Sequence, residues 1–559
     1  MRANLDETEV VSIVEGDYNE EYELTWKMSE EEGIEPRTLA EARSLPEWGE
    51  WERAIQEELA MLRAAGTWVL EEPPAGANIV GSKWVFKIKK DSAGNVIRRK
   101  ARLVAQGFSQ VPGVDYFDTF APVAKLASIR TVLAIAAQSD MEMEQIDIKG
   151  AYLNGELEDG EVIYMQHPPG YQPMGAEGKV LRLRKTLYGL KQSGRRWYQK
   201  LTWIFVDQLG FKRCDVDQAI YFRQLPPDLI VIVVHVDDCT LVATRHALIT
   251  KLKSDISQYV EISDLGPLHW LLGIQVKRNR ELRTLGLSQA SYIRAILHRF
   301  NFDELKSVSS PMDPNLRLDS SQSPQTAVER AVMRHAPYRE ALGCLMYAAM
   351  GTRPDIAFSV TLLSRFSQNP GPVHWNAVRR VFRYLKGTTD LWLTYGTGTE
   401  MNKREIRAYT DADGNQQEDR KAISGNAFLI DGGAVSWYSK QQELISLSTT
   451  ESEYVAATHA AKEAIWLRQL IGQIFEPIVD PIPLFCDNQS AIALAKDHQY
   501  HARTKHIDIR YHFIRWVCEQ GHIQLIYCPT GDMLADVLTK PLPSFKTKHF
   551  AAELGLQPL

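Results

Sequence analysis

The sequence is poor in cysteine and has no long hydrophobic run. Its six cysteines stand far apart among 559 residues, and none forms a CxxC pair. This spacing argues against a disulfide framework and favours a reducing compartment. Cys518, His522 and Cys528, with His512 nearby, fit no closed zinc pattern. There is neither a signal peptide nor an apolar run near about 20 residues, so we expect a soluble protein and no membrane partner.

A pooled net charge of −6 hides an uneven distribution. Residues 1–58 hold 18 acidic and five basic side chains, and the rest of the chain therefore carries +7. Residues 83–107 alone hold eight basic side chains and one acid, interleaved with Trp84 and Phe86. The overall charge thus does not exclude nucleic acid as a partner, and the basic stretch predicts phosphate contacts. A charged strand that faces only solvent is the alternative.

Hydrophobic periodicity divides the chain into several units. Residues 1–45 are acidic and lack long apolar patterns, which indicates a tail or linker. In the first half of the chain, the pattern predicts a helix and strand over 50–70, a β-hairpin over 82–108, a helix and strand over 128–148, a helix over 195–211 and a buried strand over 230–236. Beyond it, the pattern predicts mostly helix over 246–300, interrupted by "HWLLGIQVKRN" at 269–279, a Ser/Pro-rich linker over 307–325, helices within 337–395 and an α/β domain from about residue 404.

Three aspartates follow predicted strands in the first half of the chain. Asp147 closes the strand "EQIDI", and Asp237 and Asp238 follow the buried strand "IVIVVHV". If these strands share a sheet, the three carboxylates meet at its edge, and one of them becomes neutral unless a cation is bound. Mg²⁺ prefers such oxygen ligands, and two ions suit a phosphoryl transfer. A polar hairpin turn is the alternative interpretation of "DD".

A second set of four carboxylates comes from four separate predicted elements of the C-terminal domain: Asp411, Glu451, Asp487 and Asp536. A two-metal nuclease gives such groups a reason to meet. Glu451 has a competing role, because Ser448 and Thr450 can each open a capping box with Glu451 or Glu453 three residues later. Asp413 is an alternative ligand.

Long motifs in a fixed order give the chain a family resemblance. The motifs that carry the resemblance are "SKWVFK", "KARLVAQGF", "DYFDTFAPV", "IDIKGAYLNGEL", "KTLYGLKQSGRRWYQKL", "VHVDD", "TRPDIAFSV" and "STTESEYVAA". The chain closely resembles the polymerase region of copia-type LTR retrotransposons, and its sequence is most similar to those of fungal elements. The resemblance runs from about Trp48 to about Leu542. It implies an α+β right-hand polymerase with fingers, palm, thumb and connection, followed by an α/β RNase H-like domain with a mixed sheet. The implied divisions are fingers and palm at 46–245, a thumb-like region at 246–306, linker and connection at 307–403, the RNase H-like domain at 404–545 and a tail at 546–559.

The resemblance also implies roles for individual residues. Asp147 and Asp237 fall on the main metal ligands of the polymerase, with Asp238 more peripheral, and Glu451 is favoured over Glu453 as the nuclease ligand. Further implied contacts to the nucleotide are Lys100, Arg102, Tyr152, Gly189, Lys191 and Gln192. Implied contacts to primer or template are Leu272, Gly273, Lys505, His506 and Arg510. Ordinary structural roles stay open: a core tyrosine for Tyr152, a solvated basic strand for Lys100 and Arg102, an apolar hairpin core at 272–273 and an exposed helix over 505–515.

The sequence differs from the motifs typical of the family at three places. His235 stands where many relatives have tyrosine, Gly414 stands where many have tryptophan, and the "YCPTGDMLAD" loop has no histidine. These differences remove no predicted metal ligand.

The implied activity is RNA- and DNA-templated DNA synthesis with hydrolysis of RNA in the hybrid, using two Mg²⁺ per site or Mn²⁺ in its place. Implied partners are an RNA template, a DNA primer, the RNA–DNA hybrid, dNTPs, and the Gag particle and integrase of the same element. The implied location is the cytoplasm, in virus-like particles, or the nucleus. The rival interpretation is a co-opted or inactive relic that only binds nucleic acid, and a nuclease-only protein is a third.

Overall fold

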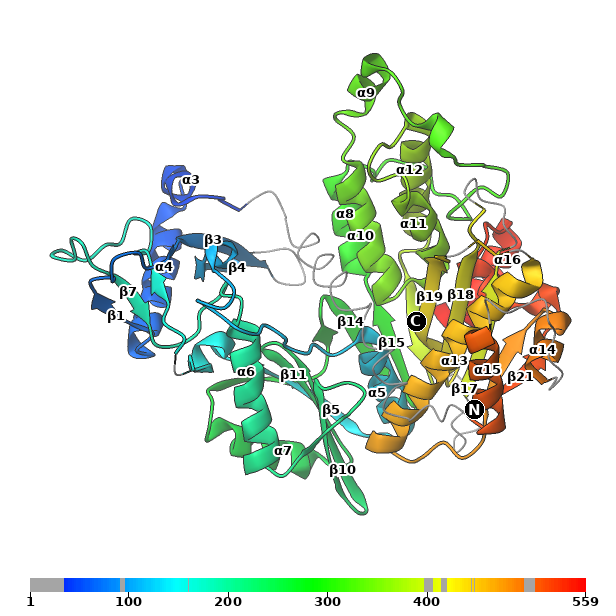
Figure 1. The fold of residues 1–559 in the computed structure, drawn as a ribbon, viewed down its shortest axis with the longest axis horizontal. Helices are drawn as coiled ribbons and strands as arrows, with labels where there is room; N and C mark the ends of the chain where they lie inside the picture. Colours follow the sequence, from blue (N-terminus) through cyan, green and yellow to red (C-terminus); the bar gives the residue numbers. More distant parts are fainter. Residues whose placement is uncertain are drawn as a thin grey trace.

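Figure 1 shows the computed structural model of the chain. It describes residues 35–90, 96–158, 160–396, 406–413, 420–443, 445–446, 448–496 and 508–559. Most of the acidic segment predicted over 1–45, the "DSAGN" turn, Lys505 and His506 therefore lie outside the described residues. Among the helices that are described, none combines the length and the apolar character that a bilayer span requires.

The first unit packs a helix against a basic hairpin. Its elements are α3 (Leu39–Ser44), α4 (Trp48–Ala64), the hairpin β3 (Ser82–Lys90) and β4 (Val96–Ala105), and a small sheet of β1 (Trp68–Glu71), β7 (Val180–Leu183), β6 (Tyr164–Met165) and β2 (Ile79–Val80). Apolar residues at helical spacing on α4 meet alternate residues of the hairpin. Trp51 and Phe86 are both buried, with ring centroids 5.2 Å apart. The helix and hairpin predicted for this region are confirmed.

A six-stranded antiparallel sheet forms the second unit. Its strand order is β12 (Ile262–Pro267), β5 (Glu142–Ile148), β11 (Asp238–Ala243), β10 (Asp228–His235), β9 (Ile220–Leu225) and β8 (Lys212–Arg213). The helices beside it are α5 (Leu126–Gln138), α6 (Ser193–Thr202) with its π-helical continuation η3 (Trp203–Gln208), and α7 (His246–Ser257). The strands that end at Asp147 and His235 lie in one sheet, as the aspartate pattern required.

The thumb-like region expected at 246–306 contains more strand than the interruption predicted at 269–279, because β12 and β15 (Thr284–Ser288) lie outside that interruption. Between α7 and α8 (Ala290–Arg299) come four strands: β12, β13 (Trp270–Leu271), β14 (Ile274–Asn279) and β15. Burial alternates along β14, where Ile274 and Val276 are buried, with the period of a strand, whereas β15 is buried throughout from Leu285 to Ser288. β15 continues into β16 (Leu391–Tyr395), and β16 pairs with β22 (Leu556–Pro558).

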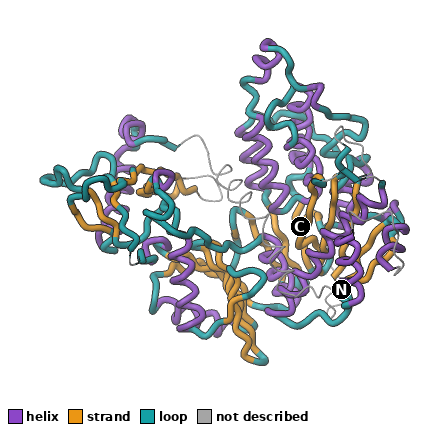
Figure 2. Tube along the Cα trace, in the orientation of Figure 1, coloured by secondary structure: helices purple, strands orange, loops and turns teal. Residues whose placement is uncertain are grey.

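The end of the chain also differs from the expected tail at 546–559. α16 (Ser544–Glu553) precedes β22, and Phe550, Leu554 and Leu556 are buried. Apolar side chains at these positions give the segment enough buried surface to fold. Upstream, four helices follow the predicted linker: α9 (Ala327–Met333), α10 (Tyr338–Gly351), α11 (Ala357–Ser364) and α12 (Pro372–Gly387). Figure 2 shows this helix-rich segment projecting from the strands of the C-terminal half.

The C-terminal unit has the predicted mixed sheet. Its strand order is β19 (Gly433–Gln441), β18 (Ile423–Ile430), β17 (Ile406–Ala412), β20 (Ile482–Cys486) and β21 (Ile523–Tyr527). β17, β18 and β19 are antiparallel neighbours, whereas β20 and β21 run parallel to β17. The associated helices are α13 (Thr449–Ile474), α14 (Gln489–Lys496), α15 (Asp508–Glu519) and the short η8 (Leu534–Leu538).

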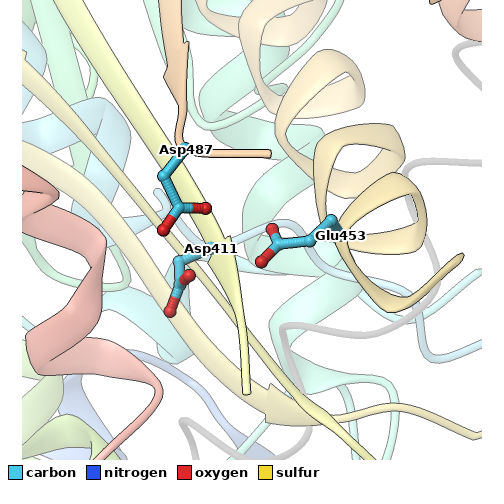
Figure 3. Close-up of side chains that lie close together, drawn as sticks. All are labelled: Asp411, Glu453 and Asp487. Carbon is cyan, nitrogen blue, oxygen red and sulfur yellow. The ribbon is translucent and has the colours of Figure 1, made fainter. Parts of the chain in front are cut away.

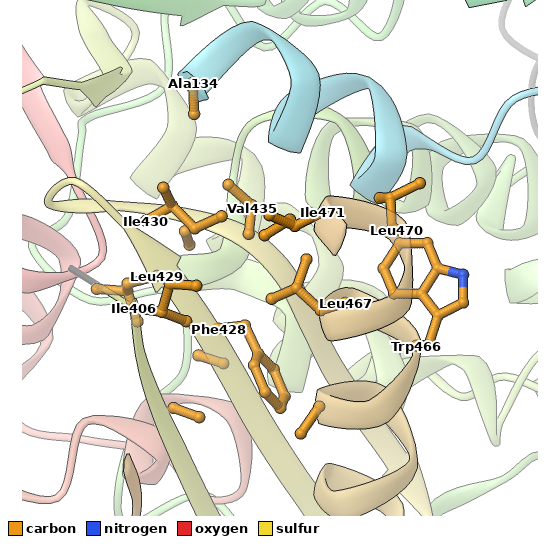
Figure 4. Packing of buried hydrophobic residues seen from close by; sticks show 14 of the residues in the cluster. Ala134, Ile406, Phe428, Leu429, Ile430, Val435, Trp466, Leu467, Leu470 and Ile471 are labelled. Carbon is orange, nitrogen blue, oxygen red and sulfur yellow. The ribbon is translucent and has the colours of Figure 1, made fainter. Parts of the chain in front are cut away.

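One hydrophobic core joins the second unit to the C-terminal unit. Figure 4 shows Ala134 of α5 above Ile430 and Val435 of the C-terminal sheet, with Ile471 of α13 beside them. Within this core Arg130 of α5 is buried, and its guanidinium lies 3.9 Å from the ring centroid of Trp437 on β19. The same guanidinium donates to the carbonyls of Val435 (2.7 Å), Met350 (2.8 Å) and Gly351 (3.0 Å). Arg130 therefore links three elements from distant parts of the sequence.

Replacing Arg130 with methionine tests this link. The change leaves buried carbonyls without a donor, so we expect the free energy of unfolding to fall by about 3 kcal/mol. Arg294→Met is the matched control, because the Arg294 side chain is largely exposed and pairs with the exposed Asp390. Urea denaturation of both variants measures the difference. Equal stability of the two variants would show that Arg130 does not join the units.

Candidate active sites

The "VDD" hairpin has a strained turn that a helix holds in place. β10 ends at His235 and β11 begins at Asp238, which leaves Val236 and Asp237 as the turn. Val236 has φ +59°, a left-handed conformation that a β-branched residue rarely adopts. The indole Nε1 of Trp197, on α6, donates a 2.6 Å hydrogen bond to the Val236 carbonyl. The neighbouring helix thereby fixes the position of the aspartate pair.

The strand register brings Asp147 to the aspartate pair. Asp147 on β5 lies directly opposite Asp238 on β11, and the Ile148 amide donates to the Asp237 carbonyl over 2.9 Å. Side chains of directly opposed residues lie on the same face with Cβ atoms about 5 Å apart. The Gln145 amide approaches Asp238 Oδ1 at 3.4 Å. The three aspartates expected to meet are thus neighbours at one edge of the sheet, and all are half-buried.

Tyr188, which the sequence pattern did not single out, lies among the predicted site residues. Its ring is 4.8 Å from that of Tyr152, edge to face, and the Arg102 guanidinium lies 5.0 Å from its centroid. Burial raises the pKa of the Tyr188 hydroxyl to about 12, and the charges of Asp237 and Asp147 act in the same direction. Arg102 and Tyr152 therefore both contact the Tyr188 ring. The only signal in the sequence is its position before Gly189 in "LYGLKQ".

The loop at Gly189–Gln192 packs tightly on the basic hairpin. Gly189 has φ +91°, and a Cβ there would lie 2.1 Å from the Ala105 carbonyl oxygen, so only glycine fits. Gln192 is fully buried; its amide donates to the Asp115 carbonyl (2.9 Å) and accepts from Gln110 (3.1 Å). The nucleotide contact expected for Gln192 stays a prediction, and in this structure both ends of its amide bind groups of the protein.

The remaining predicted contacts of this half differ in exposure. Lys191 is exposed, and Lys100 is half-buried on the same face of β4 as Arg102. Leu272 and Gly273 form the turn between β13 and β14 with φ +52° and +72°. The Leu272 side chain is buried, and its carbonyl accepts a hydrogen bond from the Tyr347 hydroxyl on α10. This burial matches the apolar hairpin core that was the alternative interpretation of the turn.

Three carboxylates meet in the C-terminal unit (Figure 3). Asp411 lies on β17, Asp487 follows β20, and Glu453 lies on α13. One oxygen from each lies within 4.8 Å of the others, and within the described ranges this is the one group of three potential ligands that meet so closely. Three separate elements thus deliver hard oxygen donors to one point.

Glu453, rather than the predicted Glu451, belongs to this group. The Ser448 hydroxyl caps α13 by accepting from the Glu451 amide at 3.2 Å, so Glu451 lies in the first turn and is only half-buried. Each residue turns a helix by about 100°, so Glu453 two positions later faces the opposite side, toward the sheet. Its exposed fraction is 6%. The sequence did not distinguish the two glutamates because both satisfy the capping pattern, and the position of Glu453 in this group favours it as the ligand.

Asp536 joins Asp411 through a lysine that the sequence pattern did not reveal. Lys540 Nζ lies 2.8 Å from Asp536 Oδ1 and 3.4 Å from Asp411 Oδ2, and the Thr539 hydroxyl donates to Asp411. The spacing of Asp536 and Lys540, four residues apart, was the available signal. Asp413, the alternative ligand, is buried and lines a cavity of about 470 Å³ together with Lys540.

The residues of the C-terminal group fit a divalent cation. Burial, and then the charges of Asp411 and Asp487, raise the pKa of Glu453 well above its ordinary value. The buried Glu453 Oε2 has no hydrogen-bond partner among the described residues. A hard cation bound between these oxygens would supply that partner and remove the repulsion.

Part of the chain matches a known family. Residues 65–314 match the family described as reverse transcriptase (RNA-dependent DNA polymerase). Residues 65–314 are therefore similar to reverse transcriptase domains. The chain as a whole is similar to the retrovirus-related Pol polyproteins of transposons.

The relatives are mostly longer proteins. The chain is 43% identical over 514 residues to the retrovirus-related Pol polyprotein from transposon TNT 1-94 of Nicotiana tabacum, covering 92% of this chain and 38% of that protein. It is 35% identical over 526 residues to the corresponding polyprotein from transposon RE2 of Arabidopsis thaliana, covering 93% of this chain and 35% of that protein. It thus spans little more than a third of these relatives. The expected likeness to fungal elements is wrong, because the Ty1-NL2 Gag-Pol polyprotein of Saccharomyces cerevisiae is only 25% identical, over 83% of this chain and 26% of that protein.

A solved structure of the foamy viral protease-reverse transcriptase dRH in complex with double-stranded DNA aligns with 86% of this chain and 70% of that one. The sequence identity is 13% and the TM-score 0.46.

Gly425 on β18 gives a test of how η8 reaches the C-terminal site. A Cβ at Gly425 would lie 2.7 Å from Thr539 Cγ2 and 2.8 Å from Leu538 Cβ. Gly425→Ala should therefore lower the free energy of unfolding by about 1–3 kcal/mol. Gly531→Ala is the control, because a Cβ there meets nothing within 4 Å. The comparison uses urea denaturation, and equal effects of the two variants would contradict the proposed packing.

Proposed function

We propose that the chain synthesises DNA on an RNA template at the Asp147–Asp237–Asp238 site and hydrolyses the RNA of the resulting hybrid at the C-terminal site. The observation that supports this proposal is the position of two clusters of carboxylates, one at the strand ends of each of two sheets that share one hydrophobic core. The reverse transcriptase match over 65–314 includes the first group. The sheet order of the C-terminal unit, with three antiparallel strands and two parallel ones, supports an RNase H-like domain around the second.

At the first site, a primer 3′-hydroxyl attacks the α-phosphate of a dNTP and pyrophosphate leaves. Asp147 and Asp237 would hold Mg²⁺, or Mn²⁺ in its place, which neutralises charge on the attacking and leaving oxygens. Arg102, which lies against Tyr188, and Lys100, on the same face of β4, would offset the charge of the triphosphate. Tyr152 and Tyr188 form an apolar surface beside them. Template pairing, rather than these side chains, would select the base.

At the second site, water attacks a phosphodiester of the RNA strand. Asp411, Glu453, Asp487 and Asp536 would hold Mg²⁺, which supplies Lewis-acid activation when bound. Lys540 holds Asp411 and Asp536 together through its ion pairs. Its ammonium offsets part of the repulsion among the carboxylates, so the site is assembled in the protein itself.

The proposed substrates are dNTPs, an RNA template with a DNA primer, and the RNA–DNA hybrid. Since the matching proteins are Pol and Gag-Pol polyproteins, we extend the proposal to action beside Gag and integrase of the same element, in cytoplasmic particles.

Primer extension tests the polymerase proposal. Purified wild-type protein should extend a DNA primer on an RNA template with Mg²⁺, and Asp237→Asn should reduce the rate by about 10²–10³-fold or more. Asp228→Asn, at the far end of the same strand, is the control and should extend normally. Absence of extension by the wild type, or unchanged extension by Asp237→Asn, would favour the binding-only relic.

Cleavage of the RNA strand of a labelled hybrid tests the nuclease proposal. Glu453→Gln removes a charge from the gathered carboxylates and should slow cleavage at least about 100-fold. Glu451→Gln, two residues away on the helix cap, should stay within about twofold of wild type. Slow cleavage by Glu451→Gln together with near-normal cleavage by Glu453→Gln would instead assign the metal-ligand role to Glu451.

A further inference from the structure

The segment that joins β4 to α5 exposes large apolar side chains and buries polar ones. Within residues 107–120, Phe108, Phe117 and Phe120 are 79%, 68% and 53% exposed, and Val111 and Val114 are exposed as well. Gln110 and Asp115, by contrast, are buried. Large apolar side chains on a surface are costly in a soluble protein and commonly mark an interaction site.

The exposed side chains do not reflect a loose backbone. Asp115 accepts hydrogen bonds from the Asn78 side chain (2.6 Å) and the Val111 amide (2.7 Å). The Gly113 amide donates to the Tyr116 carbonyl over 2.8 Å. The inward polar groups therefore fix the segment, and its aromatic side chains stay outside.

The segment lies directly against the proposed polymerase site. The Lys191 amide donates to Gln110 Oε1 over 2.8 Å, and a Cβ at Gly107 would lie 2.1 Å from the Gly189 carbonyl oxygen. Positive side chains border the segment: Arg195 pairs with Asp118 at 2.8 Å, and Lys191 is exposed beside Gln110. The start of the segment, on both sides of Phe108, thus packs against the loop that follows Tyr188.

We propose that residues 107–120 bind the unpaired template strand by stacking its bases on Phe108, Phe117 and Phe120. Single-stranded nucleic acid combines flat apolar faces with phosphates, and it suits exposed aromatics with cations at their border. A protein partner would match the apolar side chains but would not explain the continuity with the polymerase site. This inference rests on the proposed function, because that function defines which strand arrives here.

Equilibrium binding without divalent metal tests the proposal. Two labelled duplexes are compared, one blunt and one with an unpaired 5′ template extension of about ten nucleotides, a length within the site sizes of single-strand binding surfaces. The variant Phe108→Ser/Phe117→Ser/Phe120→Ser should bind the extended duplex about tenfold more weakly and the blunt duplex as wild type does. Tryptophan at the same positions should preserve the preference. The control is Phe545→Ser, since Phe545 is 70% exposed on α16.

Two outcomes overturn the stacking surface: unchanged affinity for both duplexes, or equal loss for both. Sedimentation that shows wild-type self-association abolished by the triple variant would assign the surface to a second copy and overturn it too. Primer extension by the same preparations separates the two proposals. Failure of the wild type to extend overturns the polymerase function, whereas normal extension with no preference for the extended duplex overturns the stacking surface alone.

Discussion

The mutual repulsion of gathered carboxylates is the constraint around which this molecule is organised. Burying like charges together is costly unless protons, cations or hydrogen bonds compensate. In the C-terminal unit, Lys540 supplies one positive charge to Asp411 and Asp536, yet Glu453 Oε2 has no hydrogen-bond partner in the part of the chain that the structure describes. A bound cation would supply that partner and offset the repulsion among the carboxylates.

Rigid supports keep those carboxylates together. Asp147 and Asp238 are held by strand pairing, and the Trp197 indole secures the strained turn at Val236. In the C-terminal unit, Gly425 allows η8 to approach the sheet closely enough to place Asp536 near Asp411. Because α5 and the C-terminal sheet share one core, the two carboxylate sites lie in one frame (Figure 4).

The sequence predicted the sites better than it predicted the details around them. Strand patterns before Asp147 and Asp237 predicted that these residues meet if the two strands share a sheet, and the strand order of the structure meets that condition. Glu451 and Glu453 could not be distinguished, since both satisfy a capping pattern and only the rotation of α13 against the sheet decides. Gln192 was predicted to face a ligand, but partners distant in the sequence, Gln110 and Asp115, bury it. The outward-facing Phe108 and Phe117 likewise became visible only with the folded segment.

The central claim is that Asp411, Glu453 and Asp487 form a metal site. Anomalous X-ray scattering from crystals equilibrated with Mn²⁺ tests it most directly, because it locates the ion without relying on activity. The account predicts a peak bound by these three carboxylates, and its loss in Glu453→Gln. A peak bound by Glu451, or no peak between the three carboxylates at saturating Mn²⁺, would contradict the account.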